Sequence, residues 1–475
     1  MKRLLLAIFL CVLLTTPTLA QRFNQYFSNT LYESFENPAQ GAFIPDSSKK
    51  YAFNFLLSNI SANVSVSGNA QNALRQYLFL PNRTTRPRLP INSGYVNEAK
   101  VDANVYLAMF RIFTSLDGNQ ELGFAAQIKG EGNLRFNNES VALFDGGSRF
   151  PNGTYDDILN DKYRYQTYHQ FSLLYRKELN NNWAAGFKFS VLSGILYNQI
   201  KIDQSAVTFD KTNNQISLTL RGKYQANLDQ RLLSVNDVMP LFKNPGASVS
   251  FGLAQTTEGG LKFQYNLKDL GFIHWNSDSY NTHFGGTRVL TNARSSDVGT
   301  RIYNSLYNIF GSGHARGSFY SPTDALIEVS ATKVFGLDEN NNFRYQPILV
   351  GSKELFYKGY VGAFVNNIQY KKWVLGLSSS FDDLQQYNLG AQLMYKAPNF
   401  EFFIGTEQLL QDSNVLQSAF GDNSSIMKVK SYTDVGIYLG FSVKFGPDIE
   451  TAANASHIPM GEQPGFFGRL FQNIF

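Results

Sequence analysis

The segment VGIYLGFSVKF, residues 435–445, alternates between apolar and small or polar side chains over its whole length. Its odd positions form one apolar face: Val435, Ile437, Leu439, Phe441, Val443 and Phe445. Its even positions form the other face: Gly436, Tyr438, Gly440, Ser442 and Lys444. A tilted strand of roughly 9 to 11 residues crosses a membrane with one face toward lipid and one toward a polar interior. The segment therefore predicts a membrane-spanning β-strand.

The same alternation recurs at residues 183–191, 247–253 and 388–395. Tight joints rich in Gly, Asn, Asp or Lys separate such strands, and Gly, Asn and Asp reverse a chain at low steric cost. The joints include residues 117–119, 180–182, 338–342, 371–372 and 396–399. Longer connections alternate with them, at residues 67–101, 137–165, 277–324 and 411–431. The pattern predicts an all-β chain that forms a transmembrane antiparallel β-barrel of about 14 strands, within a range of roughly 12 to 16.

A soluble sandwich or propeller is the main alternative, because its strands also alternate with period 2. The strands here run past the roughly five or six residues that are usual in soluble sheets. Phe and Tyr gather near strand ends, as they do in the aromatic girdles of membrane barrels. The sequence also shows no internal repeat of blade length. These features favour the barrel.

The first twenty residues have the layout of a cleaved secretory signal, which predicts export. Basic residues 2–3 precede an apolar run over residues 4–14, and residues 18–20 form a small-residue exit. The run is shorter than the roughly 20 residues of a spanning helix. Cys11, the one cysteine of the chain, lies in that run. We therefore expect the exported chain to have no disulfide, thiol catalyst or cysteine-based metal site.

Charge and motifs argue against several classes of function. Removing Lys2 and Arg3 from the 42 basic residues leaves 40 against 37 acidic residues, and a net charge of +3 does not predict nucleic-acid binding. The sequence contains no nucleophile elbow and no phosphate-binding loop. The histidines form no pair at metal-binding spacing, and they are His169, His274, His283, His314 and His457. We predict no enzyme, cofactor or metal site.

Asn37-Pro38-Ala39 lies just ahead of the first predicted strand and has two interpretations. An Asn at the N-cap followed by Pro at the first helical position is typical of a helix start. The proline ring also disfavours helical geometry at Asn37 itself. The other interpretation is a single turn that fastens the chain before the first strand.

The segment NQYFSNTLYESFENPAQGAF, residues 24–43, resembles the N-termini of exported barrel families of Bacteroidota-type bacteria. It is similar to the PorP/SprF-type proteins of gliding and type IX secretion, and to an uncharacterised outer-membrane family of comparable length. NPGASVSFGLAQ, residues 244–255, and LKDLGFIHWNSDS, residues 267–279, resemble the central strand pair of that uncharacterised family. An Asn-Pro-Ala also occurs in the hatch of FadL/PorV-like barrels, and FadL-type proteins transport hydrophobic compounds.

The FadL-type resemblance implies that Asn37, Pro38 and Ala39 lie in a small hatch in the lumen or the periplasm. Two departures stand out: few residues separate the predicted cleavage point from Asn37, and Gln40-Gly41-Ala42 replaces the Tyr-Ala-Gly of the secretion-linked proteins. The predicted organisation is a signal peptide at 1–20, a hatch segment at 21–50, a barrel at 51–445 and a periplasmic tail at 446–475.

Residues 277–324 hold several arginines and a helical-looking patch. The arginines are Arg288, Arg294, Arg301 and Arg316, and the patch is Ile302, Leu306 and Ile309. One interpretation is a basic constriction folded into the lumen, and the other is an exposed loop. Arg83, Arg86 and Arg88 are predicted to lie in another exposed loop. In the tail, helical spacing predicts an amphipathic helix from Phe466, Phe467, Leu470, Phe471, Ile474 and Phe475.

Three hypotheses for function follow. The first is a conduit for a small lipophilic ligand, which rests on the Asn-Pro-Ala resemblance and the aromatic content. The second is a structural or accessory subunit of a type IX secretion or gliding machinery, with other proteins of that machinery as partners. The third is a barrel enzyme. All three place the chain in the cell outer membrane, in contact with its lipid and without nucleic acid.

Overall fold

The computed structural model describes residues 23–40, 49–54, 57–74, 89–91, 94–115, 118–143, 149–228, 235–295, 297–313, 315–339, 342–384, 386–413 and 434–449. Three predictions lie outside these residues. They concern the signal peptide at 1–20, the amphipathic helix of the tail, and the loop with Arg83, Arg86 and Arg88.

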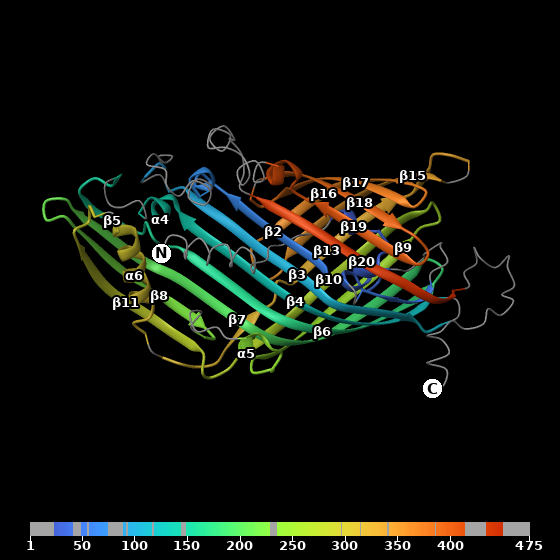
Figure 1. Cartoon of the computed structure of the whole chain (residues 1–475), viewed down its shortest axis with the longest axis horizontal. Coiled ribbons are helices and arrows are strands. Elements are labelled where there is room, and N and C mark those ends of the chain that lie inside the picture. Colours follow the sequence, from blue (N-terminus) through green and yellow to red (C-terminus); the bar gives the residue numbers. More distant parts are fainter. Residues whose placement is uncertain are drawn as a thin grey trace.

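The strands form one antiparallel sheet that closes on itself (Figure 1). β20 (Val435–Asp448) pairs with β19 (Phe400–Thr406) on one side. On its other side it pairs with β1 (Lys49–Phe53) and β2 (Asn59–Ser67). Both of these pair with β3 (Val96–Phe113), so the ring is closed.

The other strands follow around the ring. They are β4 (Gln120–Asn137), β5 (Gly153–Asp156), β6 (Lys162–Asn180), β7 (Trp183–Asp210), β8 (Gln215–Ala226), β9 (Pro245–Thr256), β10 (Leu261–Trp275), β11 (Tyr280–Thr291), β12 (Phe319–Pro322), β13 (Leu326–Lys333), β14 (Phe335–Gly336), β15 (Phe343–Glu354), β16 (Tyr360–Tyr370), β17 (Trp373–Asp382) and β18 (Tyr387–Lys396). In some positions around the ring, two or three shorter strands follow one another in line and together take the place of one long strand. Counted by position, the described strands occupy 14 places. The prediction of an all-β antiparallel barrel of about 14 strands is confirmed.

The alternation in the sequence determines which side chains face outward. On β7, Phe187 and Phe189 are 46% and 43% exposed, whereas Lys188 between them is 1% exposed and faces the lumen. On β6, Leu173 is 64% exposed, and Leu349 on β15 is 63% exposed. An apolar outer face of this kind is stable against lipid and costly against water. The outside of the barrel is therefore a membrane-facing surface.

No helix within the described ranges combines the length and apolar character needed to cross a membrane.

The sheet continues past the barrel at one end, which we call the outer end, through β5, the outer part of β7, β8 and β11. The inner part of β7 pairs with β9 and its outer part with β8, so β8 and β9 share one place. β10 and β11 share the next place in the same way, because β10 pairs with β9 and β11 with β8. The short helix α5 (Val235–Val238) lies between β8 and β9 in the chain. The opposite, inner end has tight turns such as Lys371–Lys372.

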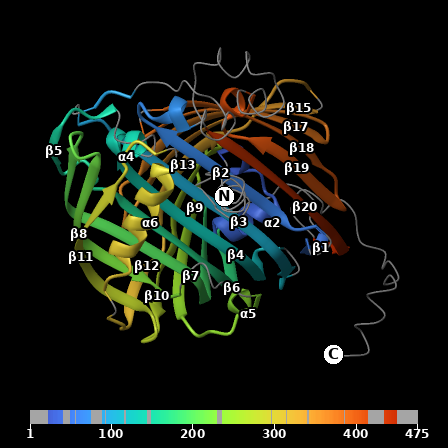
Figure 2. The same ribbon diagram turned by 60° about the vertical axis from the view of Figure 1, so that its left-hand side comes forward.

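The outer parts of these strands form an extension with its own hydrophobic core. α4 (Asn138–Leu143) and α6 (Val298–Phe310) complete it, and α6 lies over β8 and β11 (Figure 2). Ile302 and Ile309 of α6 are buried against Leu218 of β8 and Phe284 of β11 in one cluster. The predicted helical patch is thus a helix. The prediction that 277–324 is one long connection is wrong, because β11, α6 and β12 lie within it.

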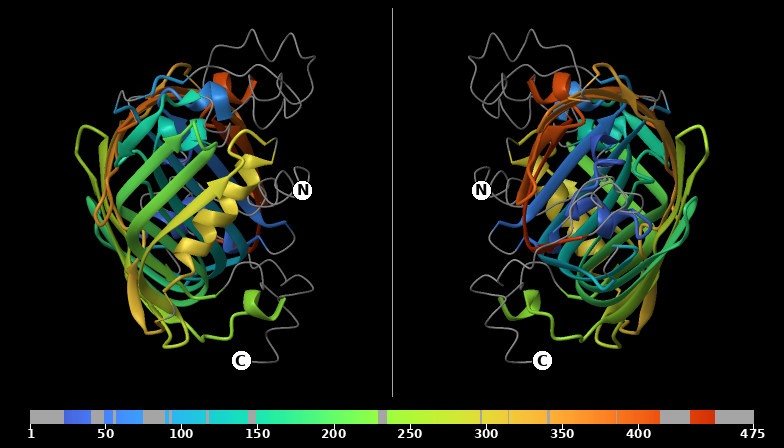
Figure 3. Two further views of the ribbon diagram at one scale, coloured as in Figure 1. Left: turned by 90° about the vertical axis from the view of Figure 1, so that its left-hand side faces the viewer. Right: turned by 90° about the vertical axis from the view of Figure 1, so that its right-hand side faces the viewer.

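The short N-terminal segment before the barrel lies inside the ring of strands (Figure 3). We call residues Phe23–Gln40 the lumen segment. It contains a 3₁₀ turn, η1 (Phe23–Gln25), and one short helix, α2 (Leu31–Glu36). Nearly all of its side chains are buried, and only Tyr26, Asn29 and Glu36 are partly exposed.

Candidate functional site in the lumen

The fold of the lumen segment begins with a helix cap. The side chain of Thr30 accepts a hydrogen bond from the backbone N–H of Glu33 at 3.2 Å, which satisfies a free donor in the first turn of α2. The carboxylate of Glu33 turns back and accepts from the N–H of Asn29 at 2.8 Å, the hydroxyl of Ser28 at 2.9 Å and the N–H of Phe27. A buried carboxylate with three donors holds the preceding turn against the helix.

The apolar face of α2 packs against the barrel wall. Tyr32 meets Tyr106 of β3 with ring centroids 5.7 Å apart and Phe403 of β19 at 5.9 Å. Phe35 lies over Gly123 of β4, where a Cβ atom would be 2.9 Å from the ring. These contacts join the lumen segment to strands on both sides of the ring closure.

The Asn-Pro-Ala motif occupies a seat formed by two glycines. Gly186 of β7 and Gly252 of β9 are direct partners in the sheet. A Cβ atom on Gly186 would overlap the carbonyl of Pro38, and one on Gly252 would be 2.5 Å from Oδ1 of Asn37. The backbone of the motif can therefore approach the wall only because neither position carries a side chain.

The motif itself forms a turn and does not begin a helix. The N–H of Gln40 donates to the carbonyl of Asn37 at 2.9 Å, and the N–H of Ala39 donates to Oδ1 of Asn37 at 3.1 Å. Asn37 is the C-cap of α2, so the interpretation as a helix start is wrong and the single turn is correct. Nδ2 of Asn37 also donates to Gln264 of β10 at 3.1 Å. The role of these residues as a hatch stays a prediction.

Charged side chains of the wall hold the end of α2. Nζ of Lys188 donates to the carbonyl of Phe35 at 2.9 Å and lies 3.1 Å from Asp269 of β10. Lys129 of β4 pairs with the same carboxylate at 2.7 Å. Glu36 pairs with Lys268 and accepts from the hydroxyl of Tyr106 at 2.7 Å. Buried ions need such partners, and each partner lost would leave an unpaired charge.

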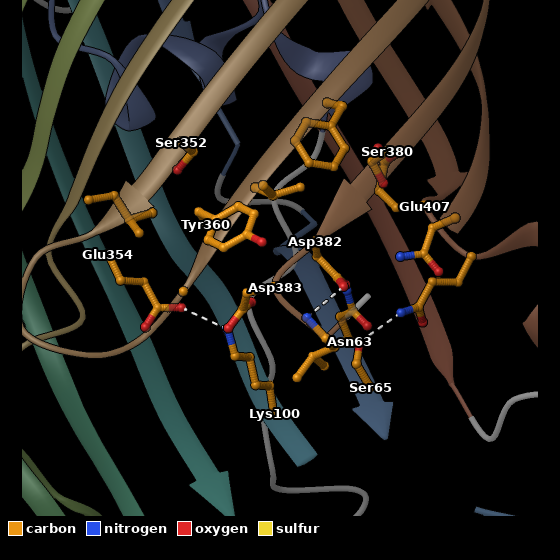
Figure 4. Close-up of a pocket in the computed structure, with 17 residues that line it drawn as sticks. Asn63, Ser65, Lys100, Ser352, Glu354, Tyr360, Ser380, Asp382, Asp383 and Glu407 are labelled. Atoms are coloured by element: carbon orange, nitrogen blue, oxygen red, sulfur yellow. Dashed lines mark hydrogen bonds and ion pairs between the residues drawn. The ribbon is translucent and has the colours of Figure 1, made fainter. Parts of the chain in front are cut away.

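A small cavity lies between the lumen segment and the outer end of the barrel (Figure 4). Its volume is about 70 Å³, and Phe23 of the lumen segment contributes to its wall. Lys100 of β3 is central, with Nζ 2.7 Å from Asp383 and 3.3 Å from Glu354. Nδ2 of Asn24 donates to the nearby Glu407 at 3.2 Å.

This small cavity, which we call the outer cavity, is rich in hydrogen-bond acceptors. Among its lining residues, Oδ2 of Asp383 and Oε1 of Gln408 are buried and have no hydrogen-bond donor within the part of the chain that the structure describes. Buried acceptors of this kind are normally satisfied by water or by a ligand that brings N–H or O–H groups. The cavity is large enough for water molecules and too small for a large ligand.

A larger cavity of about 330 Å³, which we call the inner cavity, lies between the lumen segment and the inner end of the barrel. Phe27, Ser28, Asn29, Ala39 and Gln40 of the lumen segment line one side of it. The segment is therefore a partition with a cavity on either side. Within the described residues, no group of three or more His, Cys, Asp or Glu side chains is placed to hold a metal ion.

The four arginines of 277–324 lie on the extension and make separate contacts. Arg288 and Arg294 are exposed. Arg301, half-buried on α6, donates to the carbonyl of Thr291 at 2.6 Å. Arg316 donates to the carbonyl of Asp278 at 2.6 Å and covers the ring of Tyr280. Arg288 lies on the strand β11 and Arg301 on the helix α6, so the structure shows neither a basic constriction in the lumen nor one exposed loop.

The residues that grip the lumen segment were not singled out from the sequence. Two signals were available. Thr30 and Glu33 have the spacing of a capping box, which marks a helix start ahead of Asn37. Lys129, Lys188 and Asp269 are charged residues inside apolar strands, and such residues are usually paired inside a bundle or lumen.

Comparisons with known proteins give one family and several distant structures. The model of a family of unknown function, DUF5723, matches residues 42–407. No curated protein matches the chain. A mutant of the TodX monoaromatic hydrocarbon channel is similar at 8% identity, 86% coverage of this chain, 93% of that chain and a TM-score of 0.43. The toluene transporter TodX of P. putida is similar at 8% identity, with 86% of this chain and 93% of that chain covered and a TM-score of 0.40.

A FadL homologue of Pseudomonas aeruginosa is similar at 10% identity, with 88% of this chain and 94% of that chain covered and a TM-score of 0.40. Identities and TM-scores this low say nothing about which ligand this chain binds. The family match spans most of the strands and ends just past β19, at Glu407 beside the outer cavity. The chain belongs to the family of unknown function DUF5723.

Proposed function

We propose that the protein is an outer-membrane conduit for a small ligand and that the lumen segment is its gate. One observation carries the proposal: the segment lies buried in the lumen and contributes residues to the walls of both the outer and the inner cavity. A rigid structural plug needs no cavities on both sides, whereas a gate has to separate two spaces that a ligand can occupy in turn.

The contacts of the segment suit a movable element. Many of them are hydrogen bonds and ion pairs, such as those of Lys188 and Glu36, and water can replace these when the segment shifts. Its apolar contacts are divided among three small clusters, one around α2, one around Phe23 and Phe27, and one at Ala39.

The ligand we propose is small and has a lipophilic part. The inner cavity supports this, because Phe27, Val374 and Met394 contribute to its lining. Ligand cavities typically combine such apolar surface with a few polar groups that fix orientation. The proposed location is the cell outer membrane, which the predicted signal peptide and the apolar outer surface of the closed barrel both support.

A reversible lock on the gate tests the proposal. Ala39 and Ala254 of β9 are buried in one cluster, so the pair A39C/A254C is designed to tie the lumen segment to the wall in a chain expected to have no other cysteine after export. The measurement is uptake of the apolar dye N-phenyl-1-naphthylamine by cells that carry the protein in their outer membrane. We expect oxidation to abolish the uptake and reduction to restore it.

The single variant A39C is the matched control, because it cannot form the lock. Equal uptake by oxidised and reduced A39C/A254C, with the disulfide verified by mass spectrometry, would refute the gate. The secretion-subunit hypothesis has a separate test. Native mass spectrometry after mild extraction would show a second protein at fixed stoichiometry if it is correct.

A further inference from the structure

The inner cavity has a marked imbalance of charge. Its lining includes six basic residues and no acidic one, and the basic residues are Lys262, Arg344, Lys371, Lys372, Lys396 and Lys444. They come from β10, β15, β18, β20 and the turn between β16 and β17. Strands from much of the ring thus bring positive charge to one partly open cavity.

Arg344, Lys396 and Lys444 have interaction partners within the protein. Lys444 pairs with Glu401 at 2.8 Å, and Lys396 donates to the carbonyl of Ser28 at 2.6 Å. Lys262 is half-buried and has no ion pair among the described residues. Lys371 and Lys372 are exposed at the inner mouth. A concave space with low-dielectric walls and one sign of charge concentrates ions of the opposite sign.

The same cavity has an apolar part. Phe27 of the lumen segment, Val374 of β17 and Met394 of β18 contribute to it. The volume of about 330 Å³ is at the small end of ligand cavities, which run from roughly 300 to 1,000 Å³. A ligand that matches both parts has one anionic group and a short apolar body.

We propose that the inner cavity is a binding site for a small organic anion, whose carboxylate or phosphate contacts the lysines while its apolar part lies against Phe27 and Met394. The inference rests on the proposed function and specifies its ligand class. Lys262 is the anchoring cation, because it combines partial burial with the lack of an ion pair. The segment that forms the gate also forms this wall, so ligand binding and gate position are linked.

Isothermal titration calorimetry on the full-length protein in a neutral detergent tests the site with three probes. Hexyl phosphate carries both features of the ligand, 1-hexanol has only the apolar body, and inorganic phosphate has only the charge. We expect hexyl phosphate to bind at least about tenfold more tightly than either other probe, and its affinity to fall as NaCl is raised.

Variants locate the binding. K262Q removes one charge while it keeps most of the side-chain length, and we expect hexyl phosphate affinity to fall about tenfold, the loss of one charge-assisted contact. K353Q removes an exposed lysine of β15 outside the cavity and should leave affinity unchanged. The double variant K371Q/K372Q removes the two lysines at the inner mouth. The inference is overturned if K262Q and K371Q/K372Q both bind hexyl phosphate as tightly as the native chain does. It is also overturned if 1-hexanol or inorganic phosphate alone binds as tightly as hexyl phosphate.

The locked variant A39C/A254C separates this inference from the gate. Binding of hexyl phosphate that depends on Lys262, together with dye uptake that ignores the lock, would leave the anion site standing and reject the gate. Dye uptake that responds to the lock, without any binding of hexyl phosphate, would leave the gate standing and reject the anion site.

Discussion

At the scale of single residues, two glycines decide where the lumen segment sits. Gly186 and Gly252 face each other across β7 and β9, and the Asn-Pro-Ala turn lies directly against them. A methyl group at either position would occupy space that the backbone or amide of the turn fills. Such overpacking typically costs about 1 to 3 kcal/mol where backbone has to move.

We therefore expect G186A and G252A to loosen the lumen segment and leave the barrel closed. Limited proteolysis should cleave the chain within Phe23–Gln40 faster than in the native protein, while the heat-modifiable migration typical of a folded barrel is retained. G362A is the control, because a Cβ atom on Gly362 of β16 would meet nothing within 4 Å. If G186A is cleaved at the native rate, Gly186 is not needed to hold the Asn-Pro-Ala turn against the wall.

At the scale of elements, the extension behaves as a small folded unit on top of the barrel. Ile302 of α6 is 0% exposed within its core. Replacing a buried Ile with Ala typically costs about 2 to 5 kcal/mol. We expect I302A to detach α6 from β8 and β11, visible as new proteolytic cleavage between residues 297 and 313. N304A, at an exposed position of the same helix, should not change the pattern.

The start of β20 carries a pH-dependent contact. Asp434 precedes the strand and accepts from the N–H of Val66 at 2.6 Å. Burial, and less so the nearby Asp382 and Asp412, raises the pKa of Asp434 to about 8. An unfolded Asp has a pKa of roughly 3.9, so the folded chain holds a proton that the unfolded chain has lost between these two values.

Protonated Asp434 therefore stabilises the fold at low pH. The stabilisation is complete below the unfolded pKa and is lost as pH rises through about 8. The melting temperature of the native protein should therefore fall between pH 5 and pH 9 by more than that of D434N, which keeps an uncharged side chain. Parallel pH profiles for the two proteins would show that Asp434 is ionised in the folded state.

At the scale of the whole molecule, the lumen segment and the ring are separable parts. The sheet closes through β1, β2 and β20, and none of the ring's backbone pairings involves residues 23–40. Deleting Phe23–Gln40 should join the two cavities and leave the barrel intact. In planar bilayers we expect single-channel conductance well above that of the native protein. A folded deletion variant with native conductance would show that other parts of the chain block the lumen.

The amino-acid sequence by itself determined the architecture. Period-2 alternation, as in residues 435–445, sets which face of each strand meets lipid, and a barrel is the sheet that leaves no edge unpaired there. The alternation did not predict the extension, because β11 lies outside the apolar band. Its outward residues include His283, Gly285 and Thr287, which are not apolar, so the pattern of 280–291 is typical of a loop.

The tertiary structure alone decided the site. Asn37 and Pro38 meet Gly186 and Gly252, and six basic residues spread from 262 to 444 meet around one cavity. The local sequence pattern does not predict these contacts, because sheet register and ring closure bring together residues that are far apart in the chain. The sequence thus determined that a barrel forms with a short segment before it, and only the closed ring decided what that segment touches.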